Sequence, residues 1–290
     1  MRAAKDSGKK IIFLFSDAQI ATMPLVQCSG LETHYLAPWG LPTSSADQLV
    51  LLVHGAGGSS RHWEPMLKAW SEKALLNRVF LVAIDLPGHG NSGGTVLSSV
   101  SAIADFLNAF LDALEIRHPI CLVGHSAGGL LGLQFALSYP QRVDRLMLIA
   151  TSACIQLHPD FLHQATTQNW DYATLEQSFA PDIPEALKQL VLREFQHLRL
   201  SPDADDFMDL NQVDLRPALS QLTLPITIVT GDDDVIISPR KSKLLQKELS
   251  HAELVIVPGG GHYVQVEQAA EIAAVLTNFL QTASLMPCPT

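Results

Sequence analysis

The chain alternates between short runs of apolar residues and longer stretches whose apolar residues recur every three or four positions. The short runs are rich in Val, Ile and Leu and do not alternate with polar residues. Such runs are typical of strands buried on both faces of a parallel sheet. Six segments fit this description: QLVLLVHG (48–55), RVFLVAIDLPG (78–88), PICLVGHS (119–126), VDRLMLIATS (143–152), PITIVTGDDD (225–234) and AELVIVPGGGH (252–262).

Helical spacing appears next to several of these predicted strands. Apolar residues keep a helical period from Val100 to Leu114, and again from Ile272 to Phe279. Strands that alternate with helices form βαβ units, and their strands pair in parallel. We therefore predict an α/β fold with an open, twisted and mostly parallel sheet flanked by helices.

One interval is too long for a simple connection between strands. Residues 152–216 contain no strand-like run, and they hold several prolines and the aromatic residues Phe161, Trp170, Phe179 and Phe207. We interpret 152–216 as a mainly helical cap over the sheet edge, and 21–151 together with 217–283 as the core. Residues 1–20 are interpreted as an N-terminal extension, in which KKIIFLFSD is a candidate edge strand, and 284–290 as a tail.

Composition narrows the classes of partner and location. The 290 residues carry 29 acidic and 19 basic side chains, for a net charge of −10, without a cluster of Lys and Arg. This balance argues against nucleic acid and against an anionic membrane surface. No apolar segment reaches the roughly 18 residues of a membrane span, and the early run IIFLF is too short for a secretory signal. Four widely separated cysteines indicate neither a zinc site nor a disulfide framework, so we expect reduced thiols and a cytoplasmic location.

A serine between glycines stands where the third predicted strand gives way to a helix. In GHSAG (124–128) the serine ends an apolar run, and LLGLQFAL then continues with helical spacing. So sharp a turn requires small neighbours and strained backbone angles at its centre. It also lifts the central hydroxyl out of the sheet, at the N-terminus of the helix. The pattern predicts that Ser126 is a nucleophile.

A serine hydroxyl becomes nucleophilic when a base accepts its proton and an acid orients that base. His262 follows three glycines at the exit of the last predicted strand, and it is the candidate base. The run GDDDV after the preceding strand offers the acid: its spacing from Gly231 favours Asp234, with Asp233 as the alternative. All three candidates follow predicted parallel strands, whose carboxyl ends meet at one edge of the sheet.

Six segments in order resemble the cap-bearing serine hydrolases of the α/β-hydrolase superfamily. They are SGLETHYLAPWG, LVHGAGGSSRHW, DLPGHGNS, GHSAGG, TGDDDVIISP and GGGHYVQVE. The resemblance covers nearly the whole chain from about Ser29 and implies an α/β-hydrolase fold with a helical cap. It also implies that the backbone NH groups of Ala56 and Ala127 form an oxyanion hole. Similar haloalkane dehalogenases and epoxide hydrolases use aspartate at the position of Ser126, which argues against both activities.

The chain departs from the family's pattern at two prolines. Many relatives have proline four residues beyond the acid, where this chain has Ser238, with Pro239 next. The family often also has proline two residues after the glutamate that corresponds to Glu267, and here that residue is Ala269. Neither departure removes a chemical group from the predicted site.

The resemblance implies acyl transfer, with Ser126 attacking a carbonyl, His262 accepting its proton and Asp234 holding the imidazole. We expect a carboxylesterase-like serine hydrolase (EC 3.1.1) that needs no metal and no organic cofactor. Its substrate would be a small to medium, largely apolar ester, lactone or thioester. The alternatives are a C–C bond hydrolase, an enol-lactonase or a cofactor-free perhydrolase with the same triad, and a ligand receptor on this fold.

The expected partner is therefore a small molecule. Few basic residues lie near the motifs, so the sequence offers no anchor for a phosphopantetheine or a polyanionic substrate. The aromatic residues of 152–216 are expected either in the pocket wall or in the core of the cap itself. Both a monomer and a homodimer remain open.

Overall fold

The computed structural model describes residues 24–71, 78–97, 99–167, 169–199 and 208–282. Eight strands form one sheet in the order β1-β2-β4-β3-β5-β6-β7-β8. β1 pairs antiparallel with β2, and β2 with β4, whereas all other neighbours pair in parallel. The predicted mostly parallel sheet is confirmed, and each of the six apolar runs contains one parallel strand. The strands are Leu25–Cys28 (β1), Leu31–Leu36 (β2), Gln48–Val53 (β3), Val79–Ile84 (β4), Ile120–His125 (β5), Val143–Ile149 (β6), Ile226–Gly231 (β7) and Glu253–Val257 (β8).

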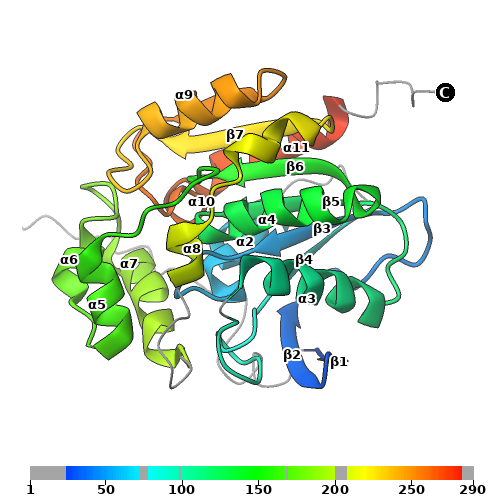
Figure 1. The fold of residues 1–290 in the computed structure, drawn as a ribbon, viewed down its shortest axis with the longest axis horizontal. Coiled ribbons are helices and arrows are strands. Elements are labelled where there is room, and N and C mark those ends of the chain that lie inside the picture. The colour runs from blue at the N-terminus through cyan, green and yellow to red at the C-terminus, as the bar shows by residue number, and fades with distance from the viewer. Residues whose placement is uncertain (1–23, 72–77, 98, 168, 200–207, 283–290) are drawn as a thin grey trace, which may run out of the picture.

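Helices cover both faces of this sheet (Figure 1). On one face lie α2 (Glu64–Ser71) and α11 (Ala269–Thr282), and on the other α3 (Val100–Ala113), α4 (Ala127–Ser138) and α9 (Pro239–Glu248). Alternate residues of a strand enter different cores: Leu51 packs with the α3 and α4 side, and Leu52 with the α2 and α11 side. The strands are apolar throughout because both of their faces are buried.

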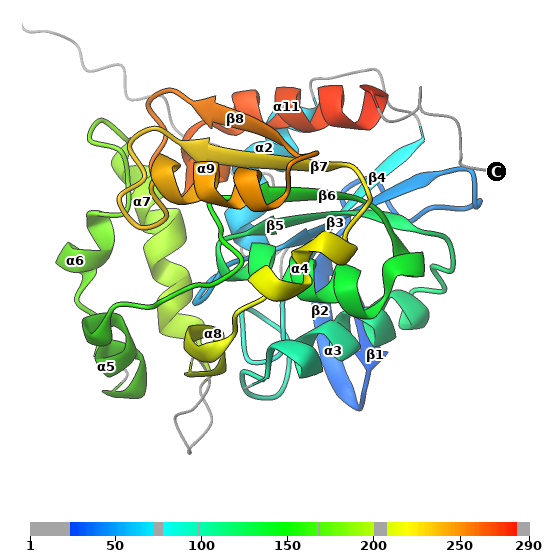
Figure 2. The same ribbon diagram turned by 45° about the horizontal axis from the view of Figure 1, so that its top comes forward.

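The interval between β6 and β7 is mainly helical in the described residues. It contains α5 (Pro159–Thr167), α6 (Tyr172–Glu176), α7 (Glu185–Leu192), η3 (Arg193–His197), α8 (Met208–Gln212) and η4 (Arg216–Gln221). Figure 2 shows α5, α6 and α7 together at one end of the sheet. The remaining short helices are η1 (Ser60–Trp63), η2 (Pro140–Arg142) and α10 (Val264–Glu267).

Residues 152–216, termed the insert below, share an apolar cluster with the chain after β8. Phe179 and Phe195 of the insert belong to the same cluster as Tyr263, and Trp170 packs against them. These rings therefore form a core of their own. Phe161 also packs on this cluster, while Phe207 lies outside the described residues.

Several expectations concern residues that the structure does not describe. The extension 1–20 with its candidate edge strand, and the tail 284–290, lie outside the described residues. Among the described cysteines, Cys28, Cys121 and Cys154 are free thiols. None of the helices in the described ranges is both long and apolar enough to cross a membrane.

Helix α4 approaches the sheet through glycines. A Cβ atom on Gly124 would lie 2.2 Å from the carbonyl oxygen of Gly128, and one on Gly128 would lie 2.4 Å from the carbonyl oxygen of Val53. Real Cβ atoms do not approach backbone this closely, so both positions require glycine. The first turn of α4 is thereby pressed onto β5 and β3.

We expect Gly124→Ala to lower the free energy of unfolding by about 1–3 kcal/mol or more, because the obstacle is backbone that cannot rotate away. Gly132→Ala is the matched control within α4. Its Cβ would meet only the side-chain ends of Leu122 and Leu146, and alanine gains about 1 kcal/mol of helix propensity over glycine. Urea unfolding of both variants measures the difference, and equal stability would contradict the packing described here.

Candidate active site

Ser126 connects β5 to α4 in a strained backbone conformation. Its φ is 53° and its ψ is −120°, a combination that costs a residue other than glycine about 1–3 kcal/mol. Its NH donates to the carbonyl of Ile149 at 2.9 Å, and its own carbonyl accepts from the Thr151 hydroxyl at 2.6 Å and the Gly129 NH at 2.9 Å. Bonds to β6 and to α4 therefore hold the serine in place.

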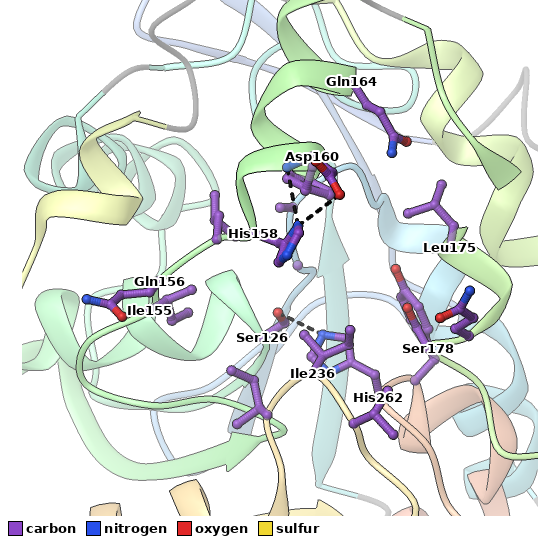
Figure 3. Close-up of a pocket in the computed structure, with 18 of the residues that line it drawn as sticks. Ser126, Ile155, Gln156, His158, Asp160, Gln164, Leu175, Ser178, Ile236 and His262 are labelled. Atoms are coloured by element: carbon purple, nitrogen blue, oxygen red, sulfur yellow. Dashed lines mark hydrogen bonds and ion pairs between the residues drawn. The ribbon is translucent and has the colours of Figure 1, made fainter. Parts of the chain in front are cut away.

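The three predicted side chains meet in one hydrogen-bond chain. His262 Nε2 lies 3.0 Å from Ser126 Oγ (Figure 3), and His262 Nδ1 lies 3.1 Å from Asp234 Oδ2. An ionised carboxylate can only accept, so Nδ1 carries the proton and donates it to Asp234. The Nε2 lone pair is then free to accept the Ser126 hydroxyl. This tautomer is the one that a general base requires.

Asp234 is buried and kept ionised by its hydrogen bonds. Burial by itself raises the pKa of a carboxyl group, and the interaction with His262 is the largest of the effects that lower it here. The backbone NH groups of Ile237 and Ile236 also donate to Oδ1, at 2.9 and 2.8 Å. Together these partners hold the pKa of Asp234 below its ordinary value.

The other two carboxylates of the run lie elsewhere. Asp232 and Asp233 are exposed, and Asp232 accepts the backbone NH of Gly259 at 2.7 Å. The structure thus brings Asp234, and not the alternative Asp233, into contact with His262.

The candidate oxyanion donors lie on adjacent elements beside the serine. Ala56 follows β3, which pairs with β5, and Ala127 is the first residue of α4. Neither NH donates a hydrogen bond within the described part of the chain, and the first NH groups of a helix have no intrahelical partner. A Cβ on Gly55 would lie 3.1 Å from Ser126 Cβ, so glycine lets the loop after β3 approach the serine.

The loop before Ala56 is supported from the segment DLPGHGNS, to which the sequence assigned no chemistry. His54 Nδ1 donates to the Gly55 carbonyl at 2.8 Å, and His54 Nε2 accepts the Leu86 NH at 3.1 Å. Burial, together with neighbouring His89, lowers the pKa of His54 to about 3, so the ring stays neutral and can play both parts. Asp85, buried below, accepts from His34 Nδ1 at 2.8 Å.

The backbone of His262 is held from two sides. Its NH donates to the carbonyl of Ser178 in the insert at 2.7 Å, and its carbonyl accepts from His125 Nε2 at 2.9 Å. Burial and the charge of His262 keep the pKa of His125 well below its ordinary value. His125 therefore acts as a neutral donor, and the insert takes part in positioning the candidate base.

Glu267 completes this support, and the sequence analysis did not find its role. Its carboxylate accepts three backbone NH groups: Ala180 of the insert at 3.0 Å, Gly261 at 2.8 Å and Tyr263 at 3.0 Å. Burial raises the pKa of Glu267, and these three bonds oppose the rise. The sequence does contain one signal for this role. A glycine-rich loop leaves backbone NH groups without partners, and a glutamate that follows it can accept them.

The Ser126 hydroxyl opens into a cavity of about 440 Å³ between the sheet and the insert. Polar side chains of the insert include Gln156, Asp160 and Gln164, and Figure 3 shows Asp160 and Gln164 across the cavity from Ser126. No Lys or Arg lines the cavity among the described residues. Ala56 lines this cavity, whereas Ala127 borders a smaller cavity beside it. The apolar lining is Ile155, Leu157, Phe161, Leu175, Phe195, Val235, Ile236 and Ile237.

Within the described residues, no group of three or more His, Cys, Asp or Glu side chains is arranged to hold a metal ion. The chemistry that the site itself offers is that of a hydroxyl, an imidazole and a carboxylate in series, next to two backbone NH groups.

Comparison with known proteins places this chain in a family. A sequence model described as "alpha/beta hydrolase fold" matches residues 48–269. "Putative carbamate hydrolase RutD" of Caulobacter sp. (strain K31) is 27% identical over 285 residues, covering 88% of this chain and 98% of that protein. The pimeloyl-[acyl-carrier protein] methyl ester esterase of Nitrosomonas europaea is 29% identical over 241 residues, covering 76% and 90%.

A solved structure supports the same fold. The enol-lactonase from Burkholderia xenovorans LB400 has a TM-score of 0.77 and 22% identity to this chain, covering 89% of this chain and 100% of that one. The α/β-hydrolase fold predicted from the six motifs is therefore confirmed, and the family match and relatives support a hydrolase.

We expect Glu267→Gln to loosen the loop that carries His262. An amide NH₂ replaces one acceptor oxygen and faces a backbone NH, so the free energy of unfolding falls by about 1–3 kcal/mol. Amide hydrogen exchange at Ala180, Gly261 and Tyr263 measures the effect directly, and all three amides should exchange faster. The control is Glu271→Gln on the exposed surface of α11, and unchanged exchange in Glu267→Gln would contradict the role given to Glu267.

Proposed function

The chain belongs to the α/β-hydrolase fold family, and we propose that it is a serine hydrolase that cleaves carboxylic esters through an acyl-enzyme. The observation that carries this proposal is the hydrogen-bond chain from Ser126 through His262 to Asp234, with Ser126 open to a cavity. Residues 152–216 act as a cap over the core formed by 21–151 and 217–283. A cytoplasmic location stays a prediction from cysteine usage.

In the first half-reaction, Ser126 Oγ attacks the ester carbonyl carbon while His262 Nε2 takes the hydroxyl proton. The charge that develops on the carbonyl oxygen is stabilised by the NH groups of Ala56 and Ala127. Asp234, already ionised, stabilises the imidazolium that forms. His262 then gives its proton to the departing alcohol, and the acyl group remains on Ser126.

In the second half-reaction, water replaces the alcohol. His262 Nε2 takes a proton from the water, the hydroxide attacks the acyl carbon, and the same two NH groups stabilise the oxyanion. Proton return from His262 to Ser126 Oγ releases the carboxylic acid. The proton transfers between Ser126 and His262 run along the hydrogen bond between these residues, and none of the proposed steps requires a cofactor.

The cavity favours an uncharged substrate of small to medium size. About 440 Å³ is within the range of small-molecule sites, and the described lining offers an anionic substrate no Lys or Arg as a partner. Similarity to a methyl ester esterase and an enol-lactonase supports cleavage of an acyl–oxygen bond. Lactones and thioesters fall within the same mechanism, as does C–C bond hydrolysis, while a receptor would bind a ligand without turnover.

We expect purified protein to hydrolyse p-nitrophenyl esters, with an optimum of acyl length that reflects the size of the cavity. Ser126→Ala and His262→Ala should each lower kcat by about 10⁴-fold or more, because the nucleophile or its base is lost. Release of p-nitrophenol at 405 nm and circular dichroism of each variant provide the rate and the control for folding. Wild-type rates in a folded Ser126→Ala variant would refute the assignment.

The identity of the acid is tested separately. Asp234→Asn should lower kcat by about 10⁴-fold, since an amide no longer fixes the required His262 tautomer. Asp233→Asn, one residue away and exposed, should change the rate by no more than about twofold. The same ester assay decides, and a more severe loss in Asp233→Asn would transfer the role to Asp233.

A further inference from the structure

Two large apolar side chains stand exposed at the rim of the cavity. Val235 is 68% and Ile236 45% exposed, and both line the cavity that holds Ser126. The other large apolar side chains exposed in the described residues, including Leu244 on α9, do not line it. Val235 and Ile236 are called the apolar lip below. Exposed apolar side chains are common on protein surfaces, so the informative observation is that these two are adjacent and border the cavity that holds Ser126.

The apolar lip is fixed to the candidate acid. Asp234 Oδ2 accepts from His262 Nδ1, while Asp234 Oδ1 accepts the backbone NH groups of Ile236 and Ile237. Ile237 is buried and anchors the segment from below. The lip is therefore a built part of the site, held by the same carboxylate that orients His262.

The position of the lip in the sheet identifies which part of an ester it meets. Ser126 follows β5; Ala56 follows β3 on one side of it, whereas Asp234 follows β7 and His262 follows β8 on the other. The carbonyl oxygen must point towards Ala56 and Ala127, and the leaving oxygen must face His262 Nε2, which gives it a proton. The leaving alcohol consequently lies on the β7 and β8 side, where the lip is.

We propose that the apolar lip binds the alcohol portion of the ester and that the preferred substrates are esters of lipophilic alcohols. This inference rests on the proposed function. The wall formed by the insert is mixed, with Gln156, Asp160 and Gln164 beside apolar residues such as Ile155 and Leu157, so the apolar lip is distinguished by its place on the side of the leaving group. An alkyl group on the alcohol is shielded from water by Val235 and Ile236, so each added methylene strengthens binding of the transition state for acylation.

Two series of esters separate the alcohol from the acyl group. In the first, acetyl is constant and the alcohol grows from methyl through butyl to octyl, so that all substrates form one acetyl-enzyme. In the second, ethanol is constant and the acyl group grows from acetyl through butyryl to octanoyl. The quantity measured is kcat/KM, by acid release in a pH-stat within the aqueous solubility of each ester.

We expect kcat/KM in the alcohol series to rise about twofold for each methylene until the lip is covered. Complete burial of a methylene is worth about fourfold, and a chain on an open lip is buried on one side only. The dependence of kcat/KM on acyl length should stay as in the wild-type protein when the apolar lip is replaced. In Val235→Ser/Ile236→Ser the rise in the alcohol series should shrink to about 1.3-fold or less for each methylene.

The control variant is Leu244→Ser. Leu244 is 50% exposed and apolar like the lip, but it lies on α9 and does not line the cavity. It should keep the wild-type dependence on alcohol length. The replaced side chains in both variants are exposed, and circular dichroism checks that each variant is folded.

The outcomes distinguish this inference from the function on which it rests. Hydrolysis that requires Ser126, rises with alcohol length and loses this rise in the lip variant supports the inference. Hydrolysis that requires Ser126 but does not rise with alcohol length, or a rise that survives in Val235→Ser/Ile236→Ser, overturns it and leaves the esterase intact. If no ester is cleaved in a Ser126-dependent way, the proposed function itself fails.

Discussion

The site depends on one backbone constraint, the left-handed conformation of Ser126 between β5 and α4. A serine at φ 53° is unfavourable by itself, and it persists because its surroundings leave it no alternative. Its NH is bound to β6, its carbonyl to Thr151, and α4 is pressed onto the sheet through Gly124 and Gly128. The same turn that strains Ser126 places its hydroxyl above the carboxyl ends of the strands. Everything else in the site is arranged around that fixed oxygen.

His262 follows the edge strand β8, three strands away from β5, which precedes Ser126. Its loop is held by hydrogen bonds from the insert and from the core. Ser178 and Ala180 of the insert bond to His262 and to Glu267, and His125 holds the carbonyl of His262 from the core. The insert therefore does more than enclose the cavity, because the orientation of the imidazole depends on its backbone. A change in the insert that displaces Ser178 or Ala180 therefore alters the support of His262.

Most of the fold could be predicted because burial on two faces leaves a direct pattern in the sequence. The six parallel strands were visible as uninterrupted apolar runs, and the order of Ser126, Asp234 and His262 followed from their positions after strands. The choice between Asp233 and Asp234 depended on spacing alone, and the structure brings Asp234 to His262. The bonds from residues 178–180 to the loop of His262 were not predictable, since they join parts of the chain that are distant in sequence, and the position of Glu267 after a glycine-rich loop was the one signal for its role. The exposure of Val235 and Ile236 could not be predicted either, because the sequence of an apolar pair in a loop does not show whether the pair is buried.

The Asp234 carboxylate connects the orientation of His262 to the conformation of the segment that carries the apolar lip. One carboxylate oxygen fixes the His262 tautomer, and the other fixes the turn that presents Val235 and Ile236 to the cavity. Because both oxygens are used, Asp234 cannot shift towards one partner without releasing the other. The backbone of residues 235–237 is therefore fixed by Asp234, whereas the side chains of Val235 and Ile236 are not needed for these hydrogen bonds. Under the proposed function, side-chain substitution at the apolar lip changes specificity without disturbing the hydrogen bonds of Asp234.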